Sequence, residues 1–154
     1  MSQGKQPKSK GYCAGTNKPR VGSFVAAPKV PRHLNLQRTG RPVWSFRLLD
    51  TDGPWCWKKI HNPADILKKM ADWESMTFTE IFQGRGSHEV PQDNLTPEAI
   101  DRLNVLGLDM AESVTSMRLT SASRLICLRQ DDILQVLWWD PEHTVAKSNH
   151  RDRG

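Results

Sequence analysis

The sequence predicts an α+β fold in which helices pack on one face of a small, mostly antiparallel sheet. Segments with helix-start signals lie between residues 62 and 107, and β-prone segments joined by tight turns lie between 114 and 139. A further β-prone segment, residues 43–49, precedes the helices. Consecutive strands with short connections pair antiparallel. The predicted order is therefore one strand, three helices and three strands.

Each predicted helix begins with a recognisable start signal. Asn62 can cap the first helix, and Pro63 suits its first position because proline lacks the N–H that would be unpaired there. The stretch 77–80, Thr-Phe-Thr-Glu, has the spacing of a capping box for a short second helix. Thr96 and Pro97 open the third helix, and Gly107 is expected to end it.

The predicted strands of the last third are residues 114–120, 124–129 and 133–139. Because side chains alternate along a strand, Trp138 and Trp139 should point to opposite faces of the sheet. The stretch 88–94 is predicted as a loop. The residues expected to be buried are Ile66, Met70, Ile100, Leu103, Leu125, Ile133 and Leu137.

Charge divides the 154-residue chain into a basic tail and a slightly acidic domain. Residues 1–42 hold nine Lys or Arg and no Asp or Glu, whereas residues 43–154 hold thirteen bases and seventeen acids. The first segment has few and aperiodic apolar residues, which predicts disorder. We expect a disordered basic tail at 1–42, the α+β domain at 43–146 and a flexible C-terminal tail at 147–154.

Several classes of protein are not expected from this sequence. It has no apolar run long enough for a membrane-spanning helix, and no apolar segment follows its basic N-terminus as in a secretory signal. Its three cysteines are widely spaced, which favours a reducing, cytoplasmic location over a disulfide framework. No spacing typical of a zinc site and no cofactor-binding fingerprint is present, so we expect neither a metal nor a cofactor.

The candidate catalytic residues are Arg118, Arg124 and His143. Arg118 and Arg124 flank a short turn between two predicted strands, and two neighbouring guanidinium groups can grip a phosphate with paired hydrogen bonds. His143 follows the last strand in Trp-Asp-Pro-Glu-His, where Asp140 and Glu142 can orient its ring or raise its pKa. The alternative is that these are solvated strand and turn residues. His61 and His88 are interpreted as surface loop residues.

A second group of residues is predicted to contact nucleic acid without taking part in catalysis. Arg129 lies on the face of its strand opposite to Arg124, and Trp139 offers a platform for a base or packs in the core. The basic tail supplies non-specific phosphate contacts or acts only as a solubilising segment. Its candidate residues are Lys5, Lys8, Lys10, Lys18 and Arg20.

The layout of residues 43–145 resembles the RelE/ParE/HigB superfamily of bacterial toxins. The resemblance rests on the segments 116–119 (Ser-Met-Arg-Leu), 123–127 (Ser-Arg-Leu-Ile-Cys) and 136–143 (Val-Leu-Trp-Trp-Asp-Pro-Glu-His). It implies a RelE-like fold and a metal-independent endoribonuclease of a toxin–antitoxin system, which inhibits growth by cutting RNA. Arg118 and Arg124 would hold the scissile phosphate, and His143 would serve as general acid or base. These toxins are usually basic throughout, whereas this domain is acidic.

The implied partners are RNA or the ribosome and an antitoxin protein, with no membrane. The alternative function is a non-catalytic accessory protein that binds nucleic acid or protein through its basic N-terminal arm. A neighbouring gene for a small acidic antitoxin would favour the toxin, and expression without a growth defect would favour the binding protein.

Overall fold

A five-stranded sheet is the centre of the computed structural model, which describes residues 39–84 and 86–148. Its strands lie in the order β1-β5-β4-β3-β2, and all neighbours are antiparallel except β1 and β5, which run parallel. The α+β class and the mostly antiparallel sheet are therefore confirmed. In chain order the elements are β1 (Val43–Ser45), the 3-10 helix η1 (Trp57–Lys59), α1 (Pro63–Glu74), α2 (Phe78–Gln83), β2 (His88–Pro91), the 3-10 helix η2 (Gln92–Asn94), α3 (Pro97–Val105), β3 (Ser113–Arg118), β4 (Arg124–Gln130) and β5 (Ile133–Asp140).

Strand β2 corrects the prediction of a loop at 88–94. It pairs with β3 at the edge of the sheet, where Val90 lies opposite Val114 and is buried. The segment contains one aliphatic residue, Val90, between Glu89 and Pro91, so it lacks the period-2 pattern that identifies a strand. Pro91 is tolerated because it stands at the end of an edge strand. Pairing with β3, rather than local sequence, makes this segment a strand.

Strand β1 is shorter than the predicted segment 43–49. After Ser45 the chain turns, and the N–H of Leu49 donates to the carbonyl of Phe46 at 3.2 Å. The next N–H, that of Asp50, donates to the carbonyl of Leu137 in β5 at 3.1 Å. The chain therefore stays beside β5 after the strand itself has ended.

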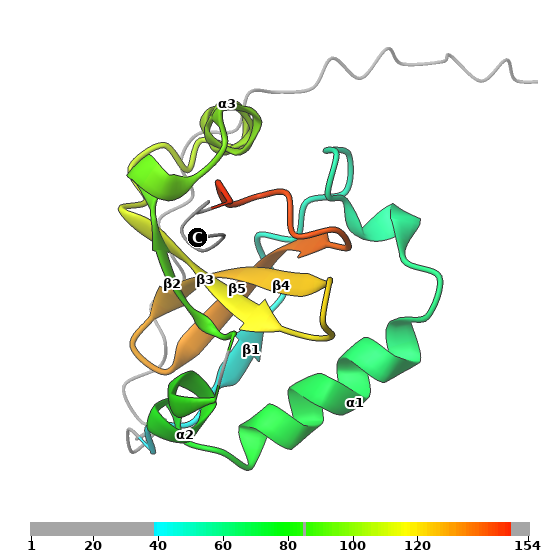
Figure 1. Cartoon of the computed structure of the whole chain (residues 1–154), viewed down its shortest axis with the longest axis vertical. Helices are drawn as coiled ribbons and strands as arrows, with labels where there is room; N and C mark the ends of the chain where they lie inside the picture. Colours follow the sequence, from blue (N-terminus) through cyan, green and yellow to red (C-terminus); the bar gives the residue numbers. More distant parts are fainter. Residues whose placement is uncertain (1–38, 85, 149–154) are drawn as a thin grey trace, which may run out of the picture. The chain divides into compact units, whose positions relative to one another are not determined.

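Helices cover both faces of the sheet, which corrects the prediction that they pack on one face. Helices α1 and α2 bury Met70 and Phe78 in a cluster with Leu125 of β4. Helix α3 buries Leu103 in a second cluster with Ile126, the next residue of β4. Figure 1 shows α3 on one side of the sheet and α1 and α2 on the other. Both faces need cover because adjacent residues of the central strands are apolar.

The predicted helix starts are confirmed, although their caps differ. Pro63 and Pro97 occupy the first turns of α1 and α3. Thr77 forms the expected capping box, in which its side chain accepts from the N–H of Glu80 and the Glu80 carboxylate accepts from the N–H of Thr77. The side chain of Thr96 does not cap α3, because its hydroxyl donates to the carbonyl of Val145.

Most of the predicted core is confirmed. Ile66, Met70, Leu103, Leu125 and Leu137 are buried, whereas Ile100 and Ile133 are only partly buried. Trp138 packs beneath α3 and Trp139 packs on the opposite face, as the alternation of side chains predicts. In the stretches 39–84 and 86–148, no helix combines the length and the apolar character needed to cross a membrane.

The predicted tails lie largely outside the described residues. At the N-terminal boundary, Gly40 accepts from the N–H of Phe78 at 2.7 Å, and its own N–H donates to Asp132 at 3.2 Å. At the C-terminal boundary, the N–H of Lys147 donates to the carbonyl of Asn94 at 2.8 Å. The contacts of the domain therefore extend beyond both ends of the predicted range 43–146, by three residues at Gly40 and by one at Lys147.

Candidate functional site

Two rows of polar side chains lie across β2, β3, β4 and β5 on the face that also carries α3. In one row, Arg118 of β3 lies opposite Arg124 of β4, and Arg124 lies opposite Asp140 of β5. The other row is displaced by two residues along β3, from Arg118 to Ser116. There His88 of β2 lies opposite Ser116 of β3. Side chains directly opposite on antiparallel strands have Cβ atoms about 4.5–5.5 Å apart. The sheet therefore gathers two arginines, a carboxylate, a histidine and a hydroxyl at one end of one face.

Arg124 is the buried centre of this group. Its side chain is 6% exposed, and Nη1 donates to the carbonyls of Thr120 and Ser123, both at 2.9 Å. Its Nε is buried without a hydrogen-bond partner within the described residues. Burial lowers the pKa of Arg124, the nearby charge of Arg118 lowers it further, and Asp140 partly opposes both effects. Arg124 thus holds the β3–β4 turn and retains one buried donor.

Arg118 reaches the group from the exposed end of β3. Its Nε donates to the carbonyl of Thr120 at 3.3 Å, and its backbone N–H donates to the hydroxyl of Ser87 at 2.9 Å. Gly86 lies against it with a φ of 109°, and a Cβ at that position would clash with the Cδ of Arg118. The tight Gly-Ser segment before β2 therefore positions this arginine.

Asp140 shapes the loop that carries His143. The carboxylate is fully buried and accepts from the N–H groups of Thr144 and Val145, each at 2.9 Å, and from the Thr144 hydroxyl at 3.2 Å. The indole N–H of Trp55 donates a hydrogen bond to the same Thr144 hydroxyl at 2.9 Å. His143 itself has a φ of 57°, in the left-handed region that few residues other than glycine adopt. This conformation is maintained by hydrogen bonds on the C-terminal side of the residue.

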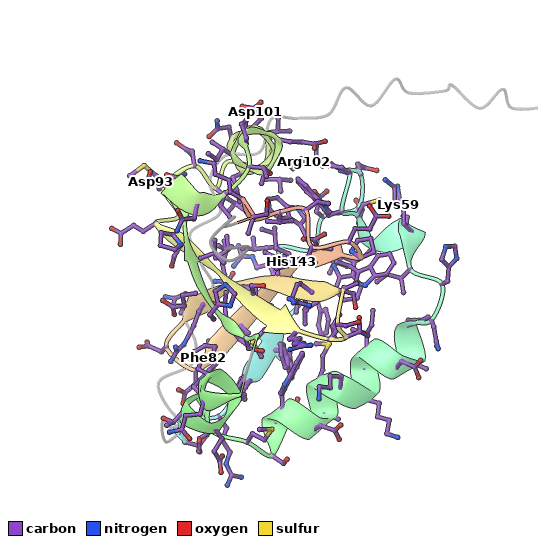
Figure 2. All side chains as sticks on the ribbon, in the orientation of Figure 1. Lys59, Phe82, Asp93, Asp101, Arg102 and His143 are labelled. Carbon is purple, nitrogen blue, oxygen red and sulfur yellow. The ribbon has the colours of Figure 1, made fainter. Side chains whose placement is uncertain are left out.

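The loop brings His143 close enough to Arg124 and His88 for their charges to act on its ring. Figure 2 shows His143 in front of β4, the strand that carries Arg124. Desolvation lowers the pKa of His143, the charges of Arg124 and His88 lower it further, and Asp140 partly opposes them. Asp140 does raise the pKa of His143, as expected, but desolvation and the charge of Arg124 outweigh it, so the net shift of this pKa is downward. A neutral imidazole that can accept a proton is favoured near pH 7.

His88 and Ser116 are functional candidates that the sequence did not reveal. His88 is exposed, as expected, but it lies on β2 beside Ser116 and not in a loop. Ser116 is 1% exposed, and its hydroxyl has no hydrogen-bond partner within residues 39–84 and 86–148. Buried hydroxyls are normally hydrogen-bonded. No local pattern marks either residue, because their positions depend on the pairing of β2 with β3.

The other predicted contact residues lie away from this group. Arg129 lies on the opposite face, with its guanidinium 3.9 Å from the centre of the Phe78 ring and 3.5 Å from the Glu89 carboxylate. It therefore stabilises the packing of α2 on the sheet. Trp139 is on that face too and is partly buried against the cluster formed by α1 and α2. The five basic candidates of the tail, Lys5, Lys8, Lys10, Lys18 and Arg20, lie outside the described residues.

No family model matches this chain, and no curated protein or solved structure matches it either. In the part of the chain that the structure describes, no three His, Cys, Asp or Glu side chains come together as a metal site.

Proposed function

We propose that this domain is a toxin-like endoribonuclease that cuts RNA without a metal, at the site formed by Arg118, Arg124 and His143. The observation that carries the proposal is the side-by-side position of the two arginines with His143 in electrostatic range of Arg124. RNA, free or on the ribosome, would be the substrate, and an antitoxin protein would be the regulatory partner in a bacterial cell.

The two arginines have different parts in this proposal. Arg118 is exposed at the end of β3 and would approach a phosphate from solvent. Arg124 is fixed by the β3–β4 turn, so its cationic charge is already in place when the phosphate arrives. Such preorganised cations stabilise the negative charge that develops on a phosphate during cleavage. Arg124 Nε and Ser116 Oγ lie on the same face and are buried without a hydrogen-bond partner among the described residues.

His143 would act as the general base and accept a proton from the RNA during cleavage. Desolvation and the neighbouring charge of Arg124 lower the pKa of His143 and disfavour imidazolium, so the ring suits the role of a general base. The fixed left-handed backbone of His143 limits the directions in which the ring can point. A positioned general base typically contributes about 10²–10⁴-fold to the rate.

The test is RNA cleavage by the purified full chain in the presence of EDTA, with growth of expressing cells as a second readout. His143→Asn is the preferred variant, because asparagine tolerates the left-handed backbone that alanine resists. We expect His143→Asn to slow cutting by about 10²–10⁴-fold with an unchanged circular dichroism spectrum. Arg118→Ala should weaken cutting as well, whereas Arg41→Ala, an exposed arginine elsewhere in the domain, should not.

Two results would overturn the proposal. If the wild-type chain neither cuts RNA nor arrests growth, the site is not a nuclease. If it binds RNA and both the wild type and His143→Asn leave it intact, the chain is the non-catalytic nucleic-acid-binding protein instead.

A further inference from the structure

A cavity of about 350 Å³ lies on the other face of the sheet, between the start of α1 and the β3–β4 turn. Trp139 forms part of its wall together with Ile66 of α1 and Leu119, the residue that follows β3. Trp139 is only partly buried, so part of its indole is available within this cavity. A mostly apolar cavity with an aromatic wall and a few polar groups is typical of a site for a small-molecule ligand.

Polar groups of both signs occupy the edge of the cavity. Asp65 and Lys69, one helical turn apart on α1, supply a carboxylate and an ammonium group. Thr120 and Ser123 of the β3–β4 turn line the opposite edge, with their hydroxyl oxygens 2.8 Å apart. A carboxylate only accepts hydrogen bonds and an ammonium only donates them. The cavity therefore suits an uncharged ring that carries donors and acceptors side by side, as a nucleobase does.

The cavity and the proposed cleavage site share the β3–β4 turn. The side chains of Thr120 and Ser123 line the cavity, while their backbone carbonyls accept from Nη1 of Arg124. A chain bound to Arg118 and Arg124 through a phosphate would therefore have a neighbouring unit next to the cavity. This continuity favours a base of the same nucleic acid over an unrelated ligand.

We propose that this cavity binds one nucleobase of the RNA substrate, packed against Trp139 and contacted by Asp65 and Lys69. The inference rests on the proposed function for its choice of ligand. The base would be held away from the scissile phosphate, on the opposite face of the sheet. It would give the cleavage a sequence preference, because Asp65 and Lys69 distinguish bases by the order of their donors and acceptors.

Free nucleosides test the cavity without the phosphate site. Adenosine, guanosine, cytidine and uridine are each titrated into the ¹⁵N-labelled full chain, and amide shifts are followed by NMR. We expect at least one nucleoside to shift the amides of Leu119 and Thr120 in a saturable way. Trp139→Leu removes the aromatic face and should weaken that binding by about tenfold, with the fold checked in the same spectrum.

Matched variants of α1 separate the edge of the cavity from general charge effects. Asp65→Asn and Lys69→Met should weaken nucleoside binding by about fivefold or more, since each removes a charged hydrogen-bonding group. Asp72→Asn and Lys68→Met alter exposed residues of the same helix that do not line the cavity. These two controls should bind nucleosides as the wild type does.

The outcomes distinguish this inference from the proposed function. If nucleosides bind but RNA is not cut, the cavity assignment stands and only the nuclease proposal fails. The cavity assignment is wrong if RNA is cut but no nucleoside binds and Asp65→Asn leaves the cleavage pattern unchanged. The nucleosides are tested up to 10 mM, on the order of ten times a weak Kd of 1 mM. Binding of benzyl alcohol without binding of any nucleoside would likewise overturn it, because the cavity would then accept apolar groups only.

Discussion

Asp50 is a buried residue that contacts segments far apart in the sequence, and its replacement should show how much these contacts stabilise the fold. Its carboxylate is 2% exposed and accepts hydrogen bonds from Arg102 of α3 at 2.6 and 2.8 Å. It also accepts from the indole N–H of Trp138 at 2.9 Å and from the N–H groups of Asp52 and Gly53, each at 3.1 Å. One carboxylate therefore ties the segment after β1 to α3 and to β5.

The expected cost of Asp50→Asn follows from these contacts. Removal of one partner from a buried ion pair typically costs about 3–5 kcal/mol. The Arg102 side chain is 20% exposed, so water can partly compensate for the lost partner. We therefore expect the lower end of that range, about 3 kcal/mol, in the free energy of unfolding. Asp101→Asn, an exposed neighbour of Arg102, is the control and should cost less than about 0.5 kcal/mol.

The effect should also depend on pH. Burial by itself raises the pKa of Asp50, but the hydrogen bonds from Arg102, Trp138 and the two backbone N–H groups lower it well below its usual value of 3.8. A carboxyl whose pKa is lower in the folded state stabilises the fold above its unfolded pKa, and this stability is lost as the pH falls through the folded pKa. The stability difference between wild type and Asp50→Asn should therefore be full at pH 7 and shrink below about pH 4.

Urea unfolding at pH 7 and pH 3, followed by circular dichroism, measures both effects. A loss under about 1 kcal/mol at pH 7 would show that water or rearrangement replaces the carboxylate. A difference between the two proteins that is the same at both pH values would refute the assignment of the lowered pKa to Asp50.

Three further predictions concern the core and the site. Leu137→Ala should cost about 2–5 kcal/mol in urea unfolding, because Leu137 is fully buried in a central strand; a loss below about 1 kcal/mol would contradict this. Gly86→Ala should lower stability by about 1–3 kcal/mol and weaken RNA binding by displacing Arg118, whereas Gly107→Ala, with positive φ but open space, should affect stability alone. If His143 is the general base, its lowered pKa places the acid limb of the pH–rate profile below 6.5, and a limb at or above that value would argue against the role.

Local signals made much of this domain predictable. The starts of α1 and α3 follow from proline at their first positions and the start of α2 from the capping box of Thr77, and these preferences act within one turn of helix. The antiparallel order of β3, β4 and β5 follows from their short connections. Arg118, Arg124 and His143 could be singled out because two arginines flank one hairpin turn and a histidine follows the last strand.

Other features depend on residues that are far apart in the chain, so only the tertiary structure decided them. β2 is a strand because β3 offers it a partner, and β1 pairs in parallel with β5 although α1, α2, β2, α3, β3 and β4 lie between them in the chain. Arg102 and Trp138 meet on Asp50, 52 and 88 residues away in sequence. The approach of His88 to His143 likewise requires every strand pairing between β2 and β5. The sequence by itself determined where the three α-helices begin and that Trp138 and Trp139 lie on opposite faces, because those properties arise from neighbouring residues. Which strands pair with one another was decided by the burial of both faces of the sheet together, and no local sequence pattern encodes that burial.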